Sequence, residues 1–279
     1  MGDISSKLST FKGVTEVHPE KSLRLTREVK ERALSAGADL VGILSAESVD
    51  SIPGHWVGWQ VRKHTVKTSH YLKEAKSVIV LGYHAWNDIH ETIMPKSGEI
   101  EYPVYIRMRL YARRVLRFLK KRGYRAVIYP DLLPQKKMAQ LAGLGAFGKN
   151  SLIINPKYGP WIRLQSVLTD AELVPDEPYK EDLCGDCDEC IRSCPVDALT
   201  HYVVDPDRCL IGITEAEWVK VLNGDLDYAS LRTEPRVMSI LDEHMPKFTE
   251  NSRLMCITCQ RACPHGREER GLAPLYKND

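Results

Sequence analysis

The chain has 279 residues and a formal net charge of +2, from 39 basic and 37 acidic side chains. This balance favours no polyanionic partner overall, and a hydrophobic fraction of 43% is close to the average for soluble globular chains. Composition therefore excludes wholesale disorder and a fibrous repeat. No apolar stretch approaches the roughly 20 residues that cross a bilayer. The polar N-terminus lacks the layout of a secretory signal, so we expect a cytoplasmic protein without membrane contact.

Hydrophobic periodicity divides the first part of the chain into an arm and an α/β domain. Residues 1–22 show no sustained period and predict an extended N-terminal arm. Alternating strand and helix patterns then predict an α/β core over residues 23–172. In chain order, the expected elements are a helix at 24–36, strands at 38–44 and 77–83, a helix at 104–122, a strand at 125–129, a helix at 134–142 and a strand at 161–168. The strand at 77–83 is continuous and β-branched, as expected for a strand covered on both faces.

The helix expected at 104–122 has a long basic surface. Its apolar residues follow one face, whereas arginine and lysine fill most of the rest, and no acidic residue occurs between Val104 and Arg125. Such a surface could bind a nucleic-acid backbone or another anion. A solvated basic face is the commoner outcome, and the sequence leaves both interpretations open.

A glycine-rich segment follows the helix expected at 134–142. Its candidate cofactor-binding residues are Gly143, Gly145, Gly148, Lys149, Asn150 and Ser151. A Rossmann fingerprint would open a helix after a strand, and the Gly-Lys pair lacks the spacing of a P-loop, so the position excludes both nucleotide motifs. Glycines allow close backbone approach to a flat or bulky cofactor, but they are equally compatible with a tight turn.

All eight cysteines lie beyond residue 183. In a mid-sized chain without an export signal, this clustering favours metal ligation over disulfides. The first four follow the Cys-x2-Cys-x2-Cys-x3-Cys-Pro pattern of bacterial ferredoxins, in which the fourth thiolate binds a second 4Fe-4S cluster. A later Cys-x2-Cys-x3-Cys-Pro run repeats the end of this pattern, and Cys209 supplies the missing ligand.

The spacing predicts two clusters with four ligands each. By the cross-ligation rule, one predicted set is Cys184, Cys187, Cys190 and Cys263, and the other is Cys194, Cys209, Cys256 and Cys259. Chain order alone leaves a swapped assignment open. Zinc sites or inert buried thiols are the alternatives, but the proline after Cys194 and after Cys263 matches the iron–sulfur form.

The cysteines define a second predicted domain at residues 173–279. A stretch at 171–182, with two prolines and several acids, is the expected linker to it. We also expect an insertion at 210–255, with helices around 214–222 and 236–244. This insertion would shape substrate access or a partner interface.

The glycine segment followed by this cysteine pattern resembles the epoxyqueuosine reductase family and its relatives, the reductive dehalogenases. The resemblance covers residues 24–264. It implies a nitroreductase-like α/β domain that holds base-off cobalamin against an α+β ferredoxin-like domain with two 4Fe-4S clusters. The segment from Gly143 to Ser151 would contact the corrin. It also implies a low-potential electron donor, such as ferredoxin or flavodoxin, and a small-molecule or modified-nucleoside substrate.

Three features depart from the family pattern. The family's proton-donating aspartate aligns with Tyr129, as in the dehalogenase relatives that use a tyrosine, and Asp131 lies two residues further on. With an unperturbed pKa of about 10, a tyrosine is protonated at neutral pH, as a proton donor must be; packing at a strand end is its alternative role. Because the sequence ends soon after Cys263, we also expect no helical-repeat extension of the kind that many family members use on tRNA, and the segment between Cys209 and Cys256 is longer than the family pattern. tRNA is therefore a possible partner that the pattern does not favour.

These observations predict a corrinoid-dependent reductase of an epoxide, an organohalide or another electrophile, with Tyr129 or Asp131 as the acid. Two other functions stay open. One is an electron-transfer or corrinoid-reducing partner without its own substrate chemistry. The other is an iron–sulfur module that has no corrinoid and uses its basic helix to hold nucleic acid.

Overall fold

A computed structural model describes residues 19–57, 63–96, 99–212, 235–250 and 252–272 of the protein. At its centre is a four-stranded sheet in which every strand pairing is antiparallel. In spatial order, its strands are β1 (Leu40–Ser45), β4 (Ser77–His84), β10 (Ile162–Thr169) and β7 (Ala126–Ile128). All residues of β4 are buried, as the continuous apolar pattern predicts.

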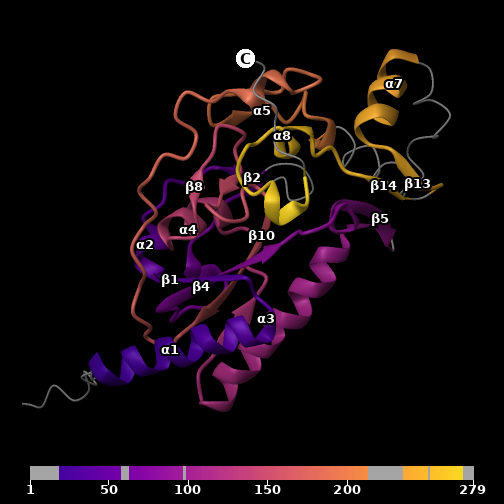
Figure 1. Ribbon diagram of the computed structural model, residues 1–279. Helices are drawn as coiled ribbons and strands as arrows, with labels where there is room; N and C mark the ends of the chain where they lie inside the picture. Colours follow the sequence, from indigo (N-terminus) through magenta and orange to yellow (C-terminus); the bar gives the residue numbers. More distant parts are fainter. Residues whose placement is uncertain (1–18, 58–62, 97–98, 213–234, 251, 273–279) are drawn as a thin grey trace, which may run out of the picture.

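Helices cover both faces of this sheet (Figure 1). The helices are α1 (Pro19–Ala36) and α3 (Pro103–Lys121) on one face, and α2 (Ala46–Asp50) and α4 (Gln135–Leu141) on the other. Alternation along β4 produces the two cores, because Ile79 and Leu81 pack with α1 and α3, whereas Val78 and Val80 pack with α4. The fold is therefore a mixed α/β sandwich, although its sheet is antiparallel.

Each element expected in the α/β domain is present. The largest difference is at the start, where α1 begins at Pro19, inside the predicted arm. Hydroxyl groups fix the N-terminal half of α1 to the chain that follows β10: Ser22 donates a hydrogen bond to the Glu172 carbonyl at 2.7 Å, and the amide of Val174 donates to the Thr26 hydroxyl oxygen at 2.8 Å. These contacts are distant in sequence, so periodicity alone could not place the helix start.

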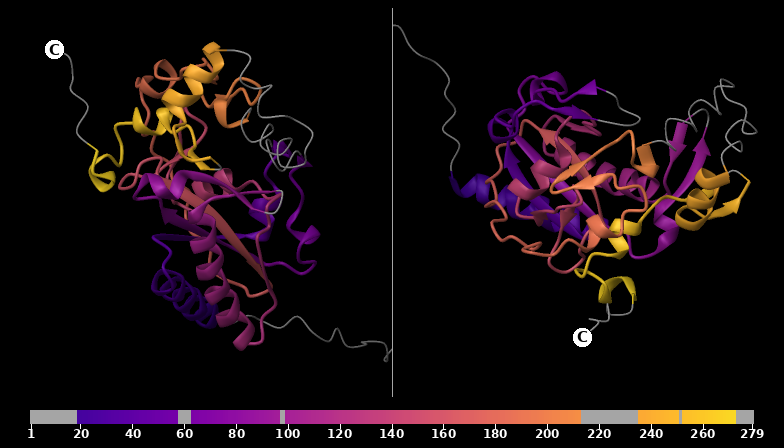
Figure 2. Two further views of the ribbon diagram at one scale, coloured as in Figure 1. Left: turned by 90° about the vertical axis from the view of Figure 1, so that its right-hand side faces the viewer. Right: turned by 90° about the horizontal axis from the view of Figure 1, so that it is seen from above.

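A second four-stranded sheet joins the predicted insertion to the α/β domain. Its order is β13 (Lys247–Thr249), β14 (Ser252–Leu254), β5 (Thr92–Lys96) and β6 (Glu99–Glu101). The register pairs Arg253 with Ile93, so strands from the two predicted domains lie side by side (Figures 1 and 2). Helix α7 (Pro235–His244) matches the helix expected at 236–244. The helix expected at 214–222 lies outside the described residues.

The predicted linker is extended and packs along the sheet. Asp176 accepts a hydrogen bond from the amide of Ile43 at 2.8 Å and forms an ion pair with Lys30. The amide of Leu173 donates to Ser77 at 3.0 Å. Each contact fixes the path that leads to the first cysteine, so the cysteine-rich part has a defined position beside the sheet.

The remaining elements are short and gather mainly around the cysteines. They are β2 (Trp56–Val57), β3 (Lys63–His64), η1 (Thr68–His70), η2 (Asp88–Glu91), β8 (Ala146–Phe147), β9 (Ile153–Ile154), α5 (Glu189–Arg192), β11 (Leu199–Thr200), β12 (Val203–Val204), α8 (Thr258–Arg261) and η4 (Glu268–Arg270). Helices α5 and α8 lie together at the end of the molecule opposite α1 (Figure 1). Within the described ranges, no helix combines the length and apolar character needed to span a membrane.

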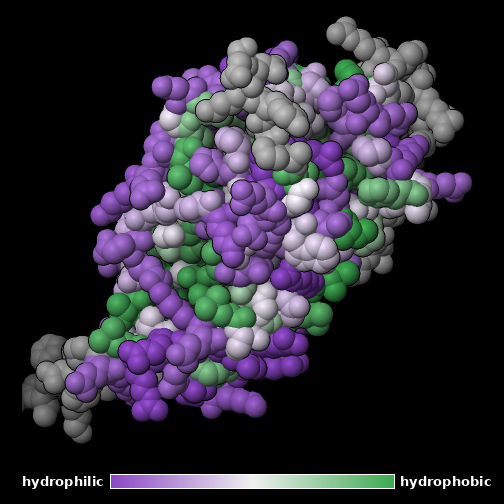
Figure 3. Space-filling model, viewed as in Figure 1, coloured by the Kyte–Doolittle hydropathy of each residue, from purple (hydrophilic) through white to green (hydrophobic). Residues whose placement is uncertain are grey.

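Part of the basic surface of α3 has a structural role. Arg107 donates to the carbonyl of His84 at 3.0 Å, Arg114 donates to the carbonyl of Ala36 at 3.1 Å, and Arg122 pairs with Glu28 at 2.8 Å. These bonds fix α3 against α1 and β4. Other basic residues of α3 are exposed, including Arg113, Arg117, Lys120 and Lys121. Hydrophilic side chains cover the lower edge of the molecule in Figure 3, where α1 lies in Figure 1.

Candidate redox site

The cysteine thiols gather around two cavities. A small cavity of about 20 Å³ is lined by one set of four, Cys184, Cys187, Cys190 and Cys263. Cys190 lies in α5, and Cys263 follows α8 by two residues, so the packing of α5 against α8 brings the distant cysteine to the run. Burial, reinforced by the neighbouring thiols, raises the pKa of Cys263 to about 12.

The second cavity is larger, about 340 Å³, and the other four cysteines contribute to its wall. They are Cys194, Cys209, Cys256 and Cys259. Burial raises the pKa of Cys209, Cys256 and Cys259, so these thiols would ionise at neutral pH only beside a compensating positive charge. Metal ions supply such a charge and deprotonate coordinating thiols. The donor set of each cavity therefore fits an iron–sulfur cluster.

These two groups of thiols coincide with the two ligand sets expected from cross-ligation. The two groups also lie next to each other, because, besides burial, the negative charge of Cys190, from the first group, raises the pKa of Cys259 together with the charges of the second group. In the described part of the chain, no three Cys, His, Asp or Glu side chains are close enough to hold a single metal ion. The thiols instead surround two volumes, and their occupation by clusters stays a prediction.

The glycine-rich segment forms a hairpin between β8 and β9. Gly143 has a φ of +77°, and a Cβ there would lie 2.8 Å from the carbonyl oxygen of Glu177. A Cβ on Gly145 would lie 2.3 Å from the Ile154 carbonyl oxygen, and one on Gly148 would lie 2.6 Å from the Ile154 side chain. The protein itself thus fills the space that these glycines leave open, and tight packing accounts for them without a cofactor.

The turn of this hairpin contacts the thiol cavities. The amide of Lys149 donates to the Cys184 sulfur at 3.5 Å, and its ammonium group pairs with Asp188 at 2.8 Å. Asn150 lines both cavities, and Ser151, with a φ of 59°, completes the turn. The segment therefore joins the α/β domain to the cysteine-rich part, while its contact with a corrin stays a prediction.

The two candidate proton donors are not among the described residues that line the larger cavity. Tyr129 follows β7 with a φ of 62°, a strained conformation for a bulky residue, and its hydroxyl lies beside the Gln165 side chain of β10. Burial raises its pKa. Asp131 is exposed, yet nearby protein raises its pKa by limiting carboxylate hydration. Arg163, which shares a face of β10 with Gln165, does line the cavity.

Several polar and aromatic residues of the larger cavity were not anticipated from the sequence. They are Tyr102, Tyr105, Lys136, Arg163 and Gln260. They come from four different parts of the fold, namely α3 with its N-cap, α4, β10 and α8. Two of them carried a signal in the sequence, since Lys136 lies in the helix that precedes the glycine segment and Gln260 directly follows Cys259.

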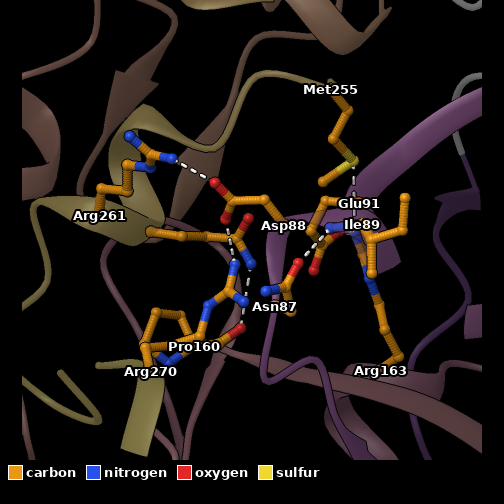
Figure 4. A network of polar contacts seen from close by, with 10 residues as sticks. Asn87, Asp88, Ile89, Glu91, Pro160, Arg163, Met255, Arg261 and Arg270 are labelled. Atoms are coloured by element: carbon orange, nitrogen blue, oxygen red, sulfur yellow. Dashed lines mark hydrogen bonds and ion pairs between the residues drawn. The ribbon is translucent and has the colours of Figure 1, made fainter. Parts of the chain in front are cut away.

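A network of ion pairs holds the cysteine-rich part against the sheet (Figure 4). Asp88 of η2 pairs with Arg261 at 2.5 Å and with Arg270 at 2.6 Å, and the Arg270 guanidinium stacks on Trp161. In the same short helix, the fully buried Glu91 pairs with the cavity residue Arg163. Arg261 belongs to α8, which also carries Cys259, so this network positions the ligands relative to the sheet.

The sequence is similar to curated epoxyqueuosine reductases, although no family model matches it. It is 27% identical over 241 residues to the enzyme of Listeria monocytogenes, covering 81% of this chain and 57% of that protein. It is 31% identical over 212 residues to the enzyme of Synechococcus sp. strain RCC307, covering 67% of this chain and 65% of that protein. The chain is a relative of the epoxyqueuosine reductases. It spans little more than half the length of the Listeria relative.

Several solved structures share the fold of this chain. The epoxyqueuosine reductase of Streptococcus thermophilus superposes with a TM-score of 0.62 at 18% identity, covering 92% of this chain and 69% of that one. A reductive dehalogenase described as B12-dependent gives a TM-score of 0.53 at 17% identity, covering 84% of this chain and 38% of that one. An epoxyqueuosine reductase in complex with a modified tRNA stem loop gives 0.54 at 24% identity, covering 68% and 57%. At these identities the similarity establishes the fold.

Proposed function

We propose that the protein is an oxidoreductase in which two 4Fe-4S clusters pass electrons to a cobalamin bound beside the larger cavity. One observation carries this proposal: the cavity of about 340 Å³ shares its wall with the four thiols of the second set. A ligand in that cavity would lie directly against an electron source.

The arrangement of the thiols gives the electron path a direction. Only the second set, which includes Cys209 and Cys259, borders the larger cavity among the described residues, so the first set would face the electron donor. The proximity of Cys190 to Cys259 would bring the two clusters together. A low-potential protein such as ferredoxin or flavodoxin is the proposed donor. A cytoplasmic location, where thiols stay reduced, fits eight free cysteines.

The proposed substrate is an electrophile that accepts electrons next to the larger cavity. Bound beside that cavity, cobalamin would supply the low-valent metal that performs the reduction. The protein contributes a cavity wall with two tyrosines, Tyr102 and Tyr105, and the guanidinium of Arg163 fixed by Glu91. The names of the relatives favour the epoxide of a modified nucleoside, whose conversion to an alkene and water requires two electrons and two protons. An organohalide is the second candidate, from the likeness to the dehalogenase fold.

Turnover by the isolated, reconstituted protein tests this function. The protein would be loaded anaerobically with iron, sulfide and cobalamin and supplied with an artificial low-potential reductant. We expect consumption of epoxyqueuosine, as the nucleoside or within a tRNA stem loop, or of an aryl halide. An electron carrier without its own substrate chemistry would reduce an acceptor protein and leave every one of these substrates unchanged.

Tyr129 is the proposed proton donor, and the variant Tyr129→Phe tests it in the same assay. We expect turnover to fall by about 10²- to 10⁴-fold, the usual contribution of a general acid. Because burial raises the Tyr129 pKa, the side chain stays protonated at neutral pH. The turnover rate of the wild type should therefore not fall between about pH 7 and 9 through deprotonation of Tyr129. Asp131→Asn is the control, with turnover near that of the wild type. The reverse pattern would assign the proton to Asp131.

A further inference from the structure

Two adjacent lysines on α4 face different surroundings. Lys136 lines the larger cavity together with Cys209 and Cys259 of the second thiol set. Lys137 is exposed, hydrogen-bonds Gln140 at 2.9 Å and borders a surface groove on the other side of the helix. Neighbouring positions on a helix point about 100° apart, which explains why one side chain reaches the thiols and the next does not. Lys137 can therefore serve as the control for Lys136, because it carries the same charge away from the thiols.

The electrostatic neighbours of Lys136 belong to the second thiol set. Burial lowers the pKa of its ammonium group, and the negative charges of Cys259 and Cys209 raise it again. In the described part of the chain, no cysteine of the first set contributes to this balance. Among the described residues, Lys136 lines the cavity of the second thiol set and not the smaller cavity of the first set. Lys136 therefore lies beside one thiol set selectively.

From this placement we propose that Lys136 is a positioning residue that raises the reduction potential of the second cluster. Reduction adds a negative charge to a cluster, and a cation beside it in a low-dielectric cavity stabilises the reduced form more than the oxidised form. A higher potential at the cluster next to the cavity would draw electrons from the first cluster toward the ligand. The inference rests on the two-cluster part of the proposed function and is independent of cobalamin.

A redox titration followed by EPR tests the inference on the full chain reconstituted with iron and sulfide alone. In the wild type, two clusters should titrate. In Lys136→Met, the midpoint potential of one cluster should fall while the other stays unchanged. Lys136→Arg, which keeps the charge, should remain near the wild type, and Lys137→Met should change neither potential. The affected cluster should be the one whose signal Cys209→Ser alters, because Cys209 belongs to the second set.

The possible outcomes separate this inference from the function on which it rests. Two clusters with unchanged potentials in Lys136→Met would overturn the role of Lys136 and leave the two-cluster reductase intact. Equal shifts of both potentials would also overturn it, since they indicate a general structural change. A wild-type protein that assembles no cluster would instead overturn the proposed function. Lys136→Gln provides the same measurement if the methionine variant does not fold.

Discussion

Replacing Cys256 and Cys259 together with alanine is expected to remove one cluster and leave the other. Both thiols line the larger cavity, and the loss of two ligands out of four leaves that cluster without sufficient support. Iron content should fall from about eight to about four per chain, with one EPR-active cluster remaining. Replacing Cys184 and Cys187 should produce the same iron content, because these two thiols line the smaller cavity.

A third pair distinguishes cross-ligation from the swapped assignment. Cys190 and Cys194 are four residues apart, but they line different cavities. The variant Cys190→Ala, Cys194→Ala should therefore disturb both clusters. If each run of cysteines held its own cluster, this variant would lose only one cluster. That result would contradict the ligand sets inferred from the grouping of the thiols in the structure. Iron analysis and EPR of the three double variants decide the question.

Replacing Glu91 with glutamine is expected to lower the free energy of unfolding by about 3 kcal/mol, because it removes a buried carboxylate that pairs with a largely buried arginine. Glu91 is fully buried and pairs with Arg163, whose side chain is 19% exposed at the cavity. Its backbone carbonyl also accepts a hydrogen bond from Met255 at 2.9 Å, next to the ligand Cys256. The change thus acts where the cysteine-rich part meets the sheet. Urea unfolding, monitored by circular dichroism, measures it.

A double-mutant cycle shows whether the loss comes from this ion pair. Arg163→Met removes the charge that Glu91 compensates, so adding Glu91→Gln to it should cost much less than Glu91→Gln alone. Glu31→Gln, at an exposed position of α1, is the control and should change stability by less than about 0.5 kcal/mol. Additive effects of the two changes would contradict a direct interaction between Glu91 and Arg163.

Short-range patterns in the sequence predicted most elements of the central fold. Helical spacing placed α3, and the β-branched run placed β4, because burial on a defined face leaves a regular signal. Cysteine spacing also separated the thiols into the groups that the structure brings together. The spacing within each run is a local signal, which the prolines after Cys194 and Cys263 reinforce, and the cross-ligation rule supplied the distant members of each set.

Contacts between distant segments carried no comparable signal. The pairing of β14 with β5, the Glu91–Arg163 ion pair and the approach of Lys136 to Cys209 each depend on topology. The sequence also could not distinguish two roles of the glycine segment, since its glycines allow close approach of a cofactor and close packing of another chain segment equally well. Antiparallel pairing of the central sheet was also not evident, because alternating helices and strands occur with either direction.

Anaerobic reconstitution with iron, sulfide and cobalamin tests the central claim most directly. After removal of unbound material, iron and cobalt would be quantified and the cobalt EPR spectrum recorded. We predict about eight irons per chain, as two 4Fe-4S clusters require, together with stoichiometric corrinoid that shows a base-off cobalt spectrum. Eight irons without retained corrinoid would contradict the claim and leave an iron–sulfur electron carrier.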